Sequence, residues 1–136
     1  MERTLVICKP DAVERGLVGE LISRLERKGL RLVAARMLLV DAELAKRLYE
    51  EHLGKPFFEG LVAFIMRSPV LAMVVEGPPE VWTVVRRLMG PTDPAEAPPG
   101  SIRGDLATTL PANVIHGSDG PEAAAREIAL FFPEHS

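Results

Sequence analysis

Apolar residues in this chain fall into short continuous runs that alternate with stretches of helical spacing. Continuous runs at 4–8, 30–40 and 70–75 are typical of buried strands, because a strand that is covered on both faces shows no polar alternation. A shorter stretch at 113–116 predicts a fourth strand near the C-terminal end. The pattern therefore predicts four strands that are separated by longer segments.

Helical spacing is clearest between Leu17 and Leu25, where apolar residues recur three and four positions apart, and Gly29 follows as a C-terminal stop. Asp11 and Glu14 stand three residues apart, as in a capping box, which predicts that a helix begins at Asp11. Similar spacing predicts further helices, which begin at Asp41 and cover 57–66, 79–89 and 121–132.

The order of these elements is strand, helix, strand, helices, strand, helix, long loop, strand and helix. It matches the ferredoxin-like β-α-β-β-α-β plan, an α/β (α+β) fold with a four-stranded antiparallel sheet, here with added helices. A doubly wound α/β sheet is the alternative, but residues 9–12 lack the glycine fingerprint that would follow its first strand. The Pro-rich segment 90–112 is too long for an ordinary connection, so we expect a functional loop that packs as a unit.

The composition limits the class of protein. With 136 residues, 47% of them hydrophobic, we expect one domain that spans 1–136 and has a proper core. No apolar run is long enough to cross a membrane. A strand-like run follows Met1 without a secretory leader, and the single cysteine, Cys8, cannot form an internal disulfide, so we expect a cytoplasmic protein. The net charge of −3 argues against a dedicated nucleic-acid binder.

One imidazole, that of His116, stands at the end of the predicted fourth strand and is followed at once by a Gly-Ser-Asp turn. A histidine in such a place is a covalent nucleophile, an acid or base, a metal ligand or a packed core residue. Asn113 is the only asparagine in a chain that has no glutamine, so its position three residues before His116 indicates a specific need for an amide side chain.

Other polar residues stand where apolar segments end or where loops are constrained. The cations Lys9, Arg86 and Arg103, together with hydroxyl and amide donors, suit an anion with several oxygens, such as a phosphate chain. No Walker-type glycine-rich sequence is present, so side chains must form such a site. No cluster has the spacing of metal ligands, and any Mg²⁺ should arrive with nucleotide phosphates. The remaining polar candidates are Tyr49, His52, Thr92, Ser118 and Glu127.

Over essentially its whole length the chain resembles the nucleoside diphosphate kinases. The resemblance rests on short motifs in the family's order and spacing. They are Cys8–Ala12, Arg15–Glu20, Pro56–Leu61, Met89–Pro94, Pro99–Asp105 and Asn113–Asp119. The resemblance implies a ferredoxin-like fold and transfer of the γ-phosphate of a nucleoside triphosphate to a nucleoside diphosphate, with Mg²⁺, through a phosphohistidine. It also implies a homo-oligomer, a hexamer in preference to a tetramer.

By position, the resemblance makes His116 the phosphorylated nucleophile and Glu127 the carboxylate that orients its ring, with Ser118 in contact with both. It makes Lys9 the group that stabilises the transferring phosphoryl and Tyr49 the tyrosine beside the nucleophile. The other matching residues bind the nucleotide: His52, Arg86, Thr92 and Arg103 contact phosphate, Phe57 stacks on the base, and Asn113 contacts the ribose and phosphate region.

Several of these residues also allow structural roles. Tyr49 can pack its ring and hydrogen-bond outward, and His52 can be a solvated residue at the end of a helix. Phe57 can belong to the core, as Phe58 does. Arg87, next to Arg86, is expected to be a solvated neighbour.

Two other functions are compatible with the sequence. A ferredoxin-like sheet can bind nucleotides or single-stranded nucleic acid without turnover, although only 5% of the residues are aromatic and no predicted strand carries an alternating aromatic pair. A phosphohistidine hydrolase would release phosphate from ATP without an acceptor, but the sequence identifies no base that would activate water.

Overall fold

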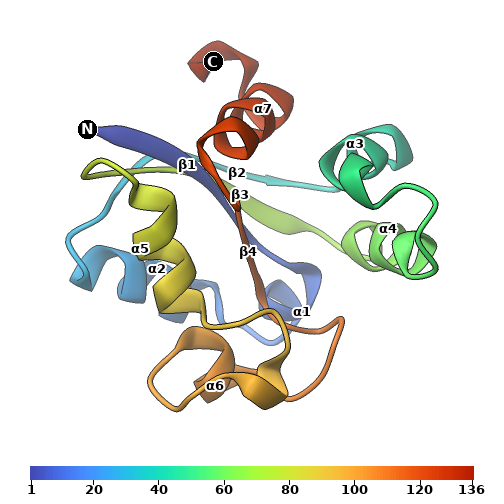
Figure 1. The fold of residues 1–136 in the computed structure, drawn as a ribbon, viewed down its shortest axis with the longest axis horizontal. Coiled ribbons are helices and arrows are strands. Elements are labelled where there is room, and N and C mark those ends of the chain that lie inside the picture. The colour runs from blue at the N-terminus through green and yellow to red at the C-terminus, as the bar shows by residue number, and fades with distance from the viewer.

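A four-stranded antiparallel sheet forms the centre of the computed structural model, which describes residues 1–136 (Figure 1). The strand order is β2-β3-β1-β4. Each neighbouring pair is antiparallel, so the predicted α+β class and the ferredoxin-like sheet are confirmed. The strands are β1 (Glu2–Cys8), β2 (Arg31–Leu38), β3 (Val70–Gly77) and β4 (Ile115–Gly117).

Seven α-helices and three short 3-10 turns connect and cover these strands. The helices at the centre of the chain begin and end close to the predicted positions, and the Asp41 side chain caps α3 by accepting a hydrogen bond from the Leu44 backbone N–H. The helices are α1 (Pro10–Glu14), α2 (Val18–Arg27), α3 (Ala42–Leu48), α4 (Phe58–Met66), α5 (Val81–Met89), α6 (Ile102–Leu106) and α7 (Pro121–Phe131). The turns are η1 (Glu50–His52), η2 (Pro94–Glu96) and η3 (Pro133–His135).

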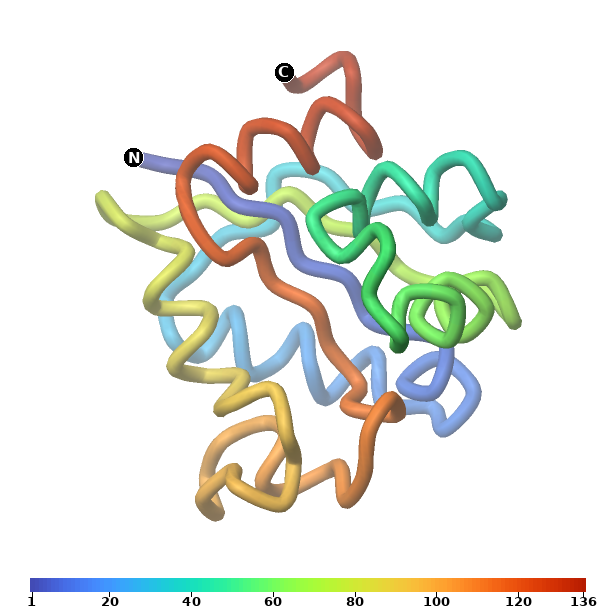
Figure 2. Tube along the Cα trace, turned by 45° about the vertical axis from the view of Figure 1, so that its right-hand side comes forward, coloured from blue at the N-terminus to red at the C-terminus, as the bar shows by residue number.

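Helices cover both faces of the sheet, which explains the continuous apolar runs of the central strands. On β1, Leu5 and Ile7 pack in a cluster with α3, α4 and α7, whereas Val6 and Cys8 pack with α2 and α5 on the opposite face. A strand between two such layers has no solvated face, so its covered stretch, such as Leu5–Cys8 in β1, is apolar at every position. Figure 2 shows β4 alongside β1, although about a hundred residues separate them in the sequence.

The predicted capping box at Asp11 is wrong. Helix α1 begins one residue earlier, at Pro10. Proline suits the first position of a helix because it has no backbone N–H that would need an acceptor there. The Asp11 side chain is buried, and its Oδ2 accepts a hydrogen bond from the distant Val114 backbone N–H at 3.0 Å. The predicted capping residue therefore serves a long-range contact.

The Pro-rich segment 90–112 contains two short helices, η2 and α6, rather than an irregular loop. The side chains of Asp93 and Ser101 cap them by accepting hydrogen bonds from the Ala95 and Gly104 backbone N–H groups. A Cβ at Gly104 would overlap the Pro98 carbonyl, so only glycine fits there. The segment therefore has a defined internal structure.

No helix in the structure combines the length and the apolar character that a membrane crossing requires.

Candidate active site

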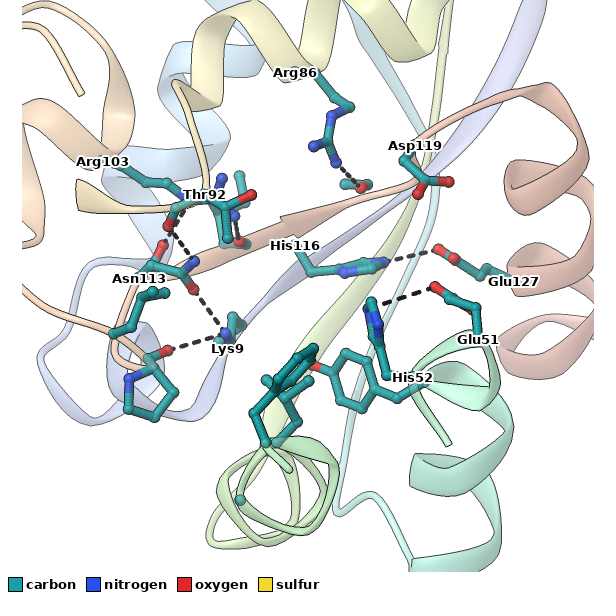
Figure 3. A pocket seen from close by; sticks show the side chains of 18 of the residues that line it. Lys9, Glu51, His52, Arg86, Thr92, Arg103, Asn113, His116, Asp119 and Glu127 are labelled. Atoms are coloured by element: carbon teal, nitrogen blue, oxygen red, sulfur yellow. Dashed lines mark hydrogen bonds and ion pairs between the residues drawn. The ribbon is translucent and has the colours of Figure 1, made fainter. Parts of the chain in front are cut away.

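A pocket of about 750 Å³ opens beside β4, between α4, the η1 turn, α5 and the segment 90–112 (Figure 3). It brings together almost all of the residues that the sequence singles out. Those that line it are Lys9, Tyr49, His52, Phe57, Arg86, Thr92, Arg103, Asn113, His116 and Glu127. Ser118 does not line the pocket but contacts Glu127 directly.

His116 lies in the middle of β4, not at its end. Its neighbours Ile115 and Gly117 are buried on the other face of the strand, so the alternation of side chains turns the imidazole into the pocket. The ring Nε2 lies 2.8 Å from Glu127 Oε1. Because an ionised carboxylate can only accept, the neutral ring carries its hydrogen on Nε2 and keeps a lone pair on Nδ1.

Glu127 is held as an anion inside the protein. Its side chain is 2% exposed, and its Oε1 also accepts a hydrogen bond from Ser118 Oγ at 2.8 Å. Burial pushes the pKa of the Glu127 carboxyl upward, but the hydrogen bond from His116, with help from Ser118 and Arg126, lowers it below its usual value. We call His116, Ser118 and Glu127 the histidine wall of the pocket.

Lys9 lies at the opposite end of the pocket, immediately after β1 (Figure 3). Its ammonium donates to Asn113 Oδ1 at 2.7 Å and to the Pro111 carbonyl at 3.1 Å. Burial lowers the pKa of Lys9 to about 8; the charge of Asp11 acts against that shift and the charge of Arg103 adds to it. Lys9 is therefore a desolvated cation that neutral oxygens position.

Arg103 is even more constrained. Its Nε, Nη1 and Nη2 donate to the carbonyls of Asn113, Gly90 and Ile115, and only 4% of the residue is exposed. Burial, with the neighbouring charge of Arg86, lowers the pKa of Arg103 to about 10. Arg103 therefore fixes the segment 90–112 to β4 and also presents its charge to the pocket.

The three pocket cations differ from the arginines on the surface. Arg86 donates to the Gly117 carbonyl, and neither it nor Lys9 or Arg103 forms an ion pair with a carboxylate. None of the three cations is therefore neutralised by direct contact with a carboxylate, which suits an anion with several oxygens. We call Lys9, Arg86 and Arg103 the cationic wall. Surface arginines that do pair with carboxylates include Arg3, Arg24, Arg36, Arg67 and Arg126.

Aromatic side chains surround the space between the walls. Tyr49 is almost fully buried, and its ring meets His116 edge-on, with the centroids 6.5 Å apart. Burial raises the pKa of the Tyr49 hydroxyl, which therefore keeps its proton. His52 lies against Phe57, whose ring is 50% exposed at the pocket, whereas Phe58 is buried in the core. The geometry leaves the Phe57 ring free to contact a ligand.

Asn113 joins the cationic wall to the Pro-rich segment. Besides accepting from Lys9, its amide Nδ2 donates to the Thr92 carbonyl at 2.9 Å. Thr92 is exposed at the pocket, and Asn113 is only 3% exposed. The only side-chain amide in the chain therefore orders two other pocket residues.

The backbone between the two walls is strained at one residue. Val114, which is β-branched and fully buried, has a φ of 60°, in a region that costs such a residue about 1–3 kcal/mol. The Val114 N–H donates a hydrogen bond to the Asp11 carboxylate. A hydrogen bond to a charged group contributes about 1.5–3 kcal/mol, which is similar to the cost of the backbone strain. This turn also explains why β4 begins two residues later than predicted, since a left-handed residue cannot continue a strand.

Two acidic residues of the pocket, Glu51 and Asp119, have no role in the sequence-based interpretation. Asp119 lies within the motif around His116, and Glu51 is next to His52, so proximity in the sequence was the only available signal. No group of three or more potential ligands is preformed for a metal ion. The two carboxylates are oxygen donors of the kind that Mg²⁺ takes, and phosphates would supply the further oxygens it needs.

Comparisons with known proteins agree with this geometry. The family model described as "Nucleoside diphosphate kinase" matches residues 2–136. A nucleoside diphosphate kinase from Thermomicrobium roseum is 60% identical over 98% of this chain and 89% of its own length. One from Thermus thermophilus is 59% identical over 97% of this chain and 96% of its own.

Solved structures of such kinases are similar throughout. The enzyme from Halobacterium salinarum, solved in complex with CDP, has a TM-score of 0.93 and 53% identity, covering 96% of this chain and 87% of its own. The structure of the enzyme from Borrelia burgdorferi is described as a transition-state mimic with bound vanadate and ADP. It has a TM-score of 0.91 and 43% identity, covering 96% of this chain and 86% of its own.

Proposed function

The chain belongs to the nucleoside diphosphate kinase family of phosphotransferases, and we propose that it works by a ping-pong mechanism in which His116 carries the phosphoryl group as a phosphohistidine. The observation that carries this proposal is the arrangement of His116: its Nε2 lies against Glu127, and its Nδ1 has no protein partner in a pocket whose three cations form no ion pair. The whole domain, residues 1–136, takes part in this function.

In the first half-reaction the lone pair of His116 Nδ1 forms a bond to the γ-phosphorus of a nucleoside triphosphate. The bond between that phosphorus and the bridging oxygen breaks, and the nucleoside diphosphate leaves with the electron pair. The ring gains positive charge as it reacts, and the Glu127 carboxylate, 2.8 Å from Nε2, stabilises that charge. The second half-reaction is the reverse, with a different diphosphate as the acceptor.

The cationic wall stabilises the charge that develops on the phosphate oxygens. Lys9 and Arg103 are desolvated and held by hydrogen bonds before substrate arrives, so they need little reorganisation during transfer. Arg86, Thr92 and His52 supply further phosphate contacts. The Tyr49 ring lies beside the nucleophile, and its protonated hydroxyl is available as a donor.

A Mg²⁺ ion that accompanies the nucleotide would neutralise charge on its phosphates, with Asp119 and Glu51 as the carboxylates of the pocket that can face it. Apart from those contacts, the chain leaves the ion to the phosphate oxygens.

The base is held at Phe57 by stacking, which every base allows because every base has a π-face. Related kinases have been solved with CDP and with ADP, which supports nucleotide binding here. Since few groups near Phe57 could read base edges, we expect the kcat/KM values for ADP, GDP, CDP and dTDP to lie within about a hundredfold of each other. A wider spread would reveal a base-reading group.

The mechanism is tested by incubating the protein with γ-labelled ATP, isolating it and adding an unlabelled diphosphate. The label should be acid-labile and alkali-stable, as a phosphoramidate is, and should pass to the diphosphate. His116→Ala should abolish labelling and transfer, whereas His135→Ala, which changes a histidine outside the pocket, should keep both. Label on Ser118, or labelling of His116→Ala, would contradict the assignment.

The same experiment separates the alternatives. Steady release of inorganic phosphate without an acceptor would identify a phosphohistidine hydrolase. Salt-dependent binding of oligonucleotides without nucleotide turnover would identify a binding module. A cytoplasmic location stays a prediction from the sequence.

We also propose a homo-oligomer, a hexamer in preference to a tetramer. The edge strand β2 supports self-association, because one side of it has no strand partner, and Met37 on the strand and Leu39 just after it are exposed. The length of the Pro-rich segment 90–112 supports it as well. Sedimentation at micromolar concentration distinguishes a hexamer from a tetramer, and a monomer would refute the proposal.

A further inference from the structure

A three-residue turn centred on Val114 separates the two pocket residues Asn113 and His116. The Ile115 N–H donates to the Asn113 carbonyl at 2.7 Å across Val114, whose φ is 60°. Turns that close over three residues with a positive φ are rare, and the conformation is least favourable for a β-branched residue. Something outside the turn must therefore hold it.

Both backbone groups of Val114 are held by the segment that follows β1. The Val114 N–H donates to Asp11 Oδ2 at 3.0 Å, and its carbonyl accepts from the Lys9 N–H at 2.9 Å. Asp11 is 3% exposed, so water cannot replace its carboxylate as the acceptor. The Lys9 contact is made by its backbone N–H, so every substitution of Lys9 except one to proline keeps it. The Asp11 contact, by contrast, depends on a side chain.

The turn determines which way Asn113 points. In a regular strand, residues 113 and 116 would lie on opposite faces, because side chains alternate and the separation is odd. Here both line the pocket, which Ile115 also borders, and the alternation is broken because Val114 and Ile115, although adjacent in sequence, both enter the same core cluster. The left-handed residue therefore brings Asn113 to the same side of the sheet as His116.

We propose that Asp11 is a positioning residue for phosphoryl transfer: its carboxylate holds Val114 in the left-handed turn, and the turn aims Asn113 and His116 into one pocket. Through Asn113 the turn also positions Lys9, whose ammonium donates to the Asn113 amide oxygen. The inference rests on the proposed function for its rate measurements, but its structural part can be measured without turnover.

Asp11 also has an electrostatic effect, which must be separated from this role. Burial lowers the pKa of Lys9 to about 8, and the Asp11 charge acts against that shift. Asp11→Asn removes the charge but keeps an oxygen that can accept from Val114, whereas Asp11→Ala removes both. Under the proposal, Asp11→Ala slows transfer about tenfold to a hundredfold, and Asp11→Asn is faster than Asp11→Ala by about tenfold.

The sharper test relieves the turn itself. In the Asp11→Ala background, Val114→Gly and Val114→Ala both remove the buried valine side chain, but only glycine adopts a positive φ at no steric cost. We expect Asp11→Ala/Val114→Gly to transfer phosphate about fivefold faster than Asp11→Ala/Val114→Ala, at matched folded fractions. A general loss of packing would affect both double variants alike.

Hydrogen exchange of the Val114 amide provides the readout without activity. It should speed up in Asp11→Ala relative to the amides that join β1 to β3, and stay protected in Asp11→Asn. Equal rates for the two double variants, or an Asp11→Asn variant as slow as Asp11→Ala, would overturn the positioning role. Unchanged Val114 exchange in Asp11→Ala would overturn it too. A parent protein that is never labelled by ATP would refute the proposed function instead, and the exchange result would still stand.

Discussion

The two walls of the pocket hold their charged groups in opposite ways. On the histidine wall, the Glu127 carboxylate accepts hydrogen bonds from both His116 and Ser118, so groups of the same wall stabilise its charge. On the cationic wall, Lys9 and Arg103 donate only to amide and carbonyl oxygens. The first wall is complete without a ligand, whereas the second keeps positive charge for an anion to neutralise.

This difference separates groups that stabilise the fold from groups that stabilise a bound phosphate. A buried carboxylate with two donors is satisfied, while a buried cation without a countercharge lowers stability until a ligand arrives. Substitutions on the cationic wall should therefore slow transfer without lowering stability, whereas substitutions on the histidine wall should remove a contribution to stability.

The largest expected effect is on the cationic wall. Lys9→Met should slow phosphoryl transfer about tenfold to a thousandfold, because one positioned charge donor is lost from the transferring group. The melting temperature at pH 7 should be no lower, since a neutral side chain avoids the cost of burying an ammonium. Quenched transfer assays measure the rate, and thermal unfolding measures the melting temperature. A fall in both quantities together would make Lys9 a structural residue.

The pH dependence sharpens this prediction. The pKa of Lys9 is lowered from 10.5 to about 8 in the folded protein, so the unfolded chain binds the proton more tightly. Lys9 therefore makes stability rise with pH between about 8 and 10.5. Lys9→Met should lack that rise in chemical denaturation measured across the same range. An identical profile for both proteins would show that the ammonium is not desolvated.

Arg36→Met is the matched control on the surface. Arg36 pairs with Glu134, donates to the Phe131 carbonyl and lies over the Phe132 ring, far from the pocket lining. This variant should lose about 1 kcal/mol of unfolding free energy, because an exposed ion pair, a hydrogen bond and a ring contact are lost. Its melting temperature should fall accordingly. Its transfer rate should be unchanged, which is the reverse of the pattern for Lys9→Met.

A smaller effect is expected at the mouth of the pocket. Phe57→Ala should raise KM for nucleoside diphosphates about tenfold with little change in kcat, because stacking on a base contributes about 1–3 kcal/mol to binding. Phe57→Tyr keeps the ring and should behave like the parent. Steady-state kinetics with two different bases measure this; a selective loss for one base would contradict simple stacking.

A modest loss of transfer rate is expected on the histidine wall. Glu127→Gln keeps an oxygen for the His116 N–H but replaces a charged hydrogen bond by a neutral one, a loss of about 1 kcal/mol. That corresponds to about fivefold slower transfer in single-turnover labelling. A variant that is completely inactive would mean that Glu127 has a direct part in the chemistry.

The lowered pKa of Glu127 also leads us to expect a small effect of acid on stability. Its pKa is below the usual value in the folded protein, so its stabilising contribution is present above pH 4.5 and is lost as the pH falls through the folded pKa. Glu127→Gln should therefore lose less stability than the parent as the pH is lowered below 4.5. Equal acid sensitivity of the two proteins would show that Glu127 is not stabilised as an anion.

Much of the fold could be predicted because its signals are local. The apolar runs that became β1 and β3 reflect burial on both faces, and the spacing of Leu17 to Leu25 reflects a helix with one buried side. The gathering of Lys9, Arg103 and His116 was predicted from residue types and from resemblance to a family, and the pocket contains all three. Their individual roles stay predictions until the variants are measured.

Other features depend on contacts between distant residues. Asp11 looks like a helix cap in the sequence, but its acceptor oxygen is used by Val114, more than a hundred residues away. The start of β4 was misplaced for the same reason, because no local propensity favours a left-handed valine.

By itself the sequence determined the elements, the two apolar layers and the kinds of side chain available for chemistry, because periodicity and residue type act over a few neighbouring positions. Only the tertiary structure decided which of the cations lack a carboxylate partner and which backbone turn carries Asn113 to the side of His116. Those outcomes depend on which atoms meet once β1 and β4 pair, and that pairing joins two ends of the chain.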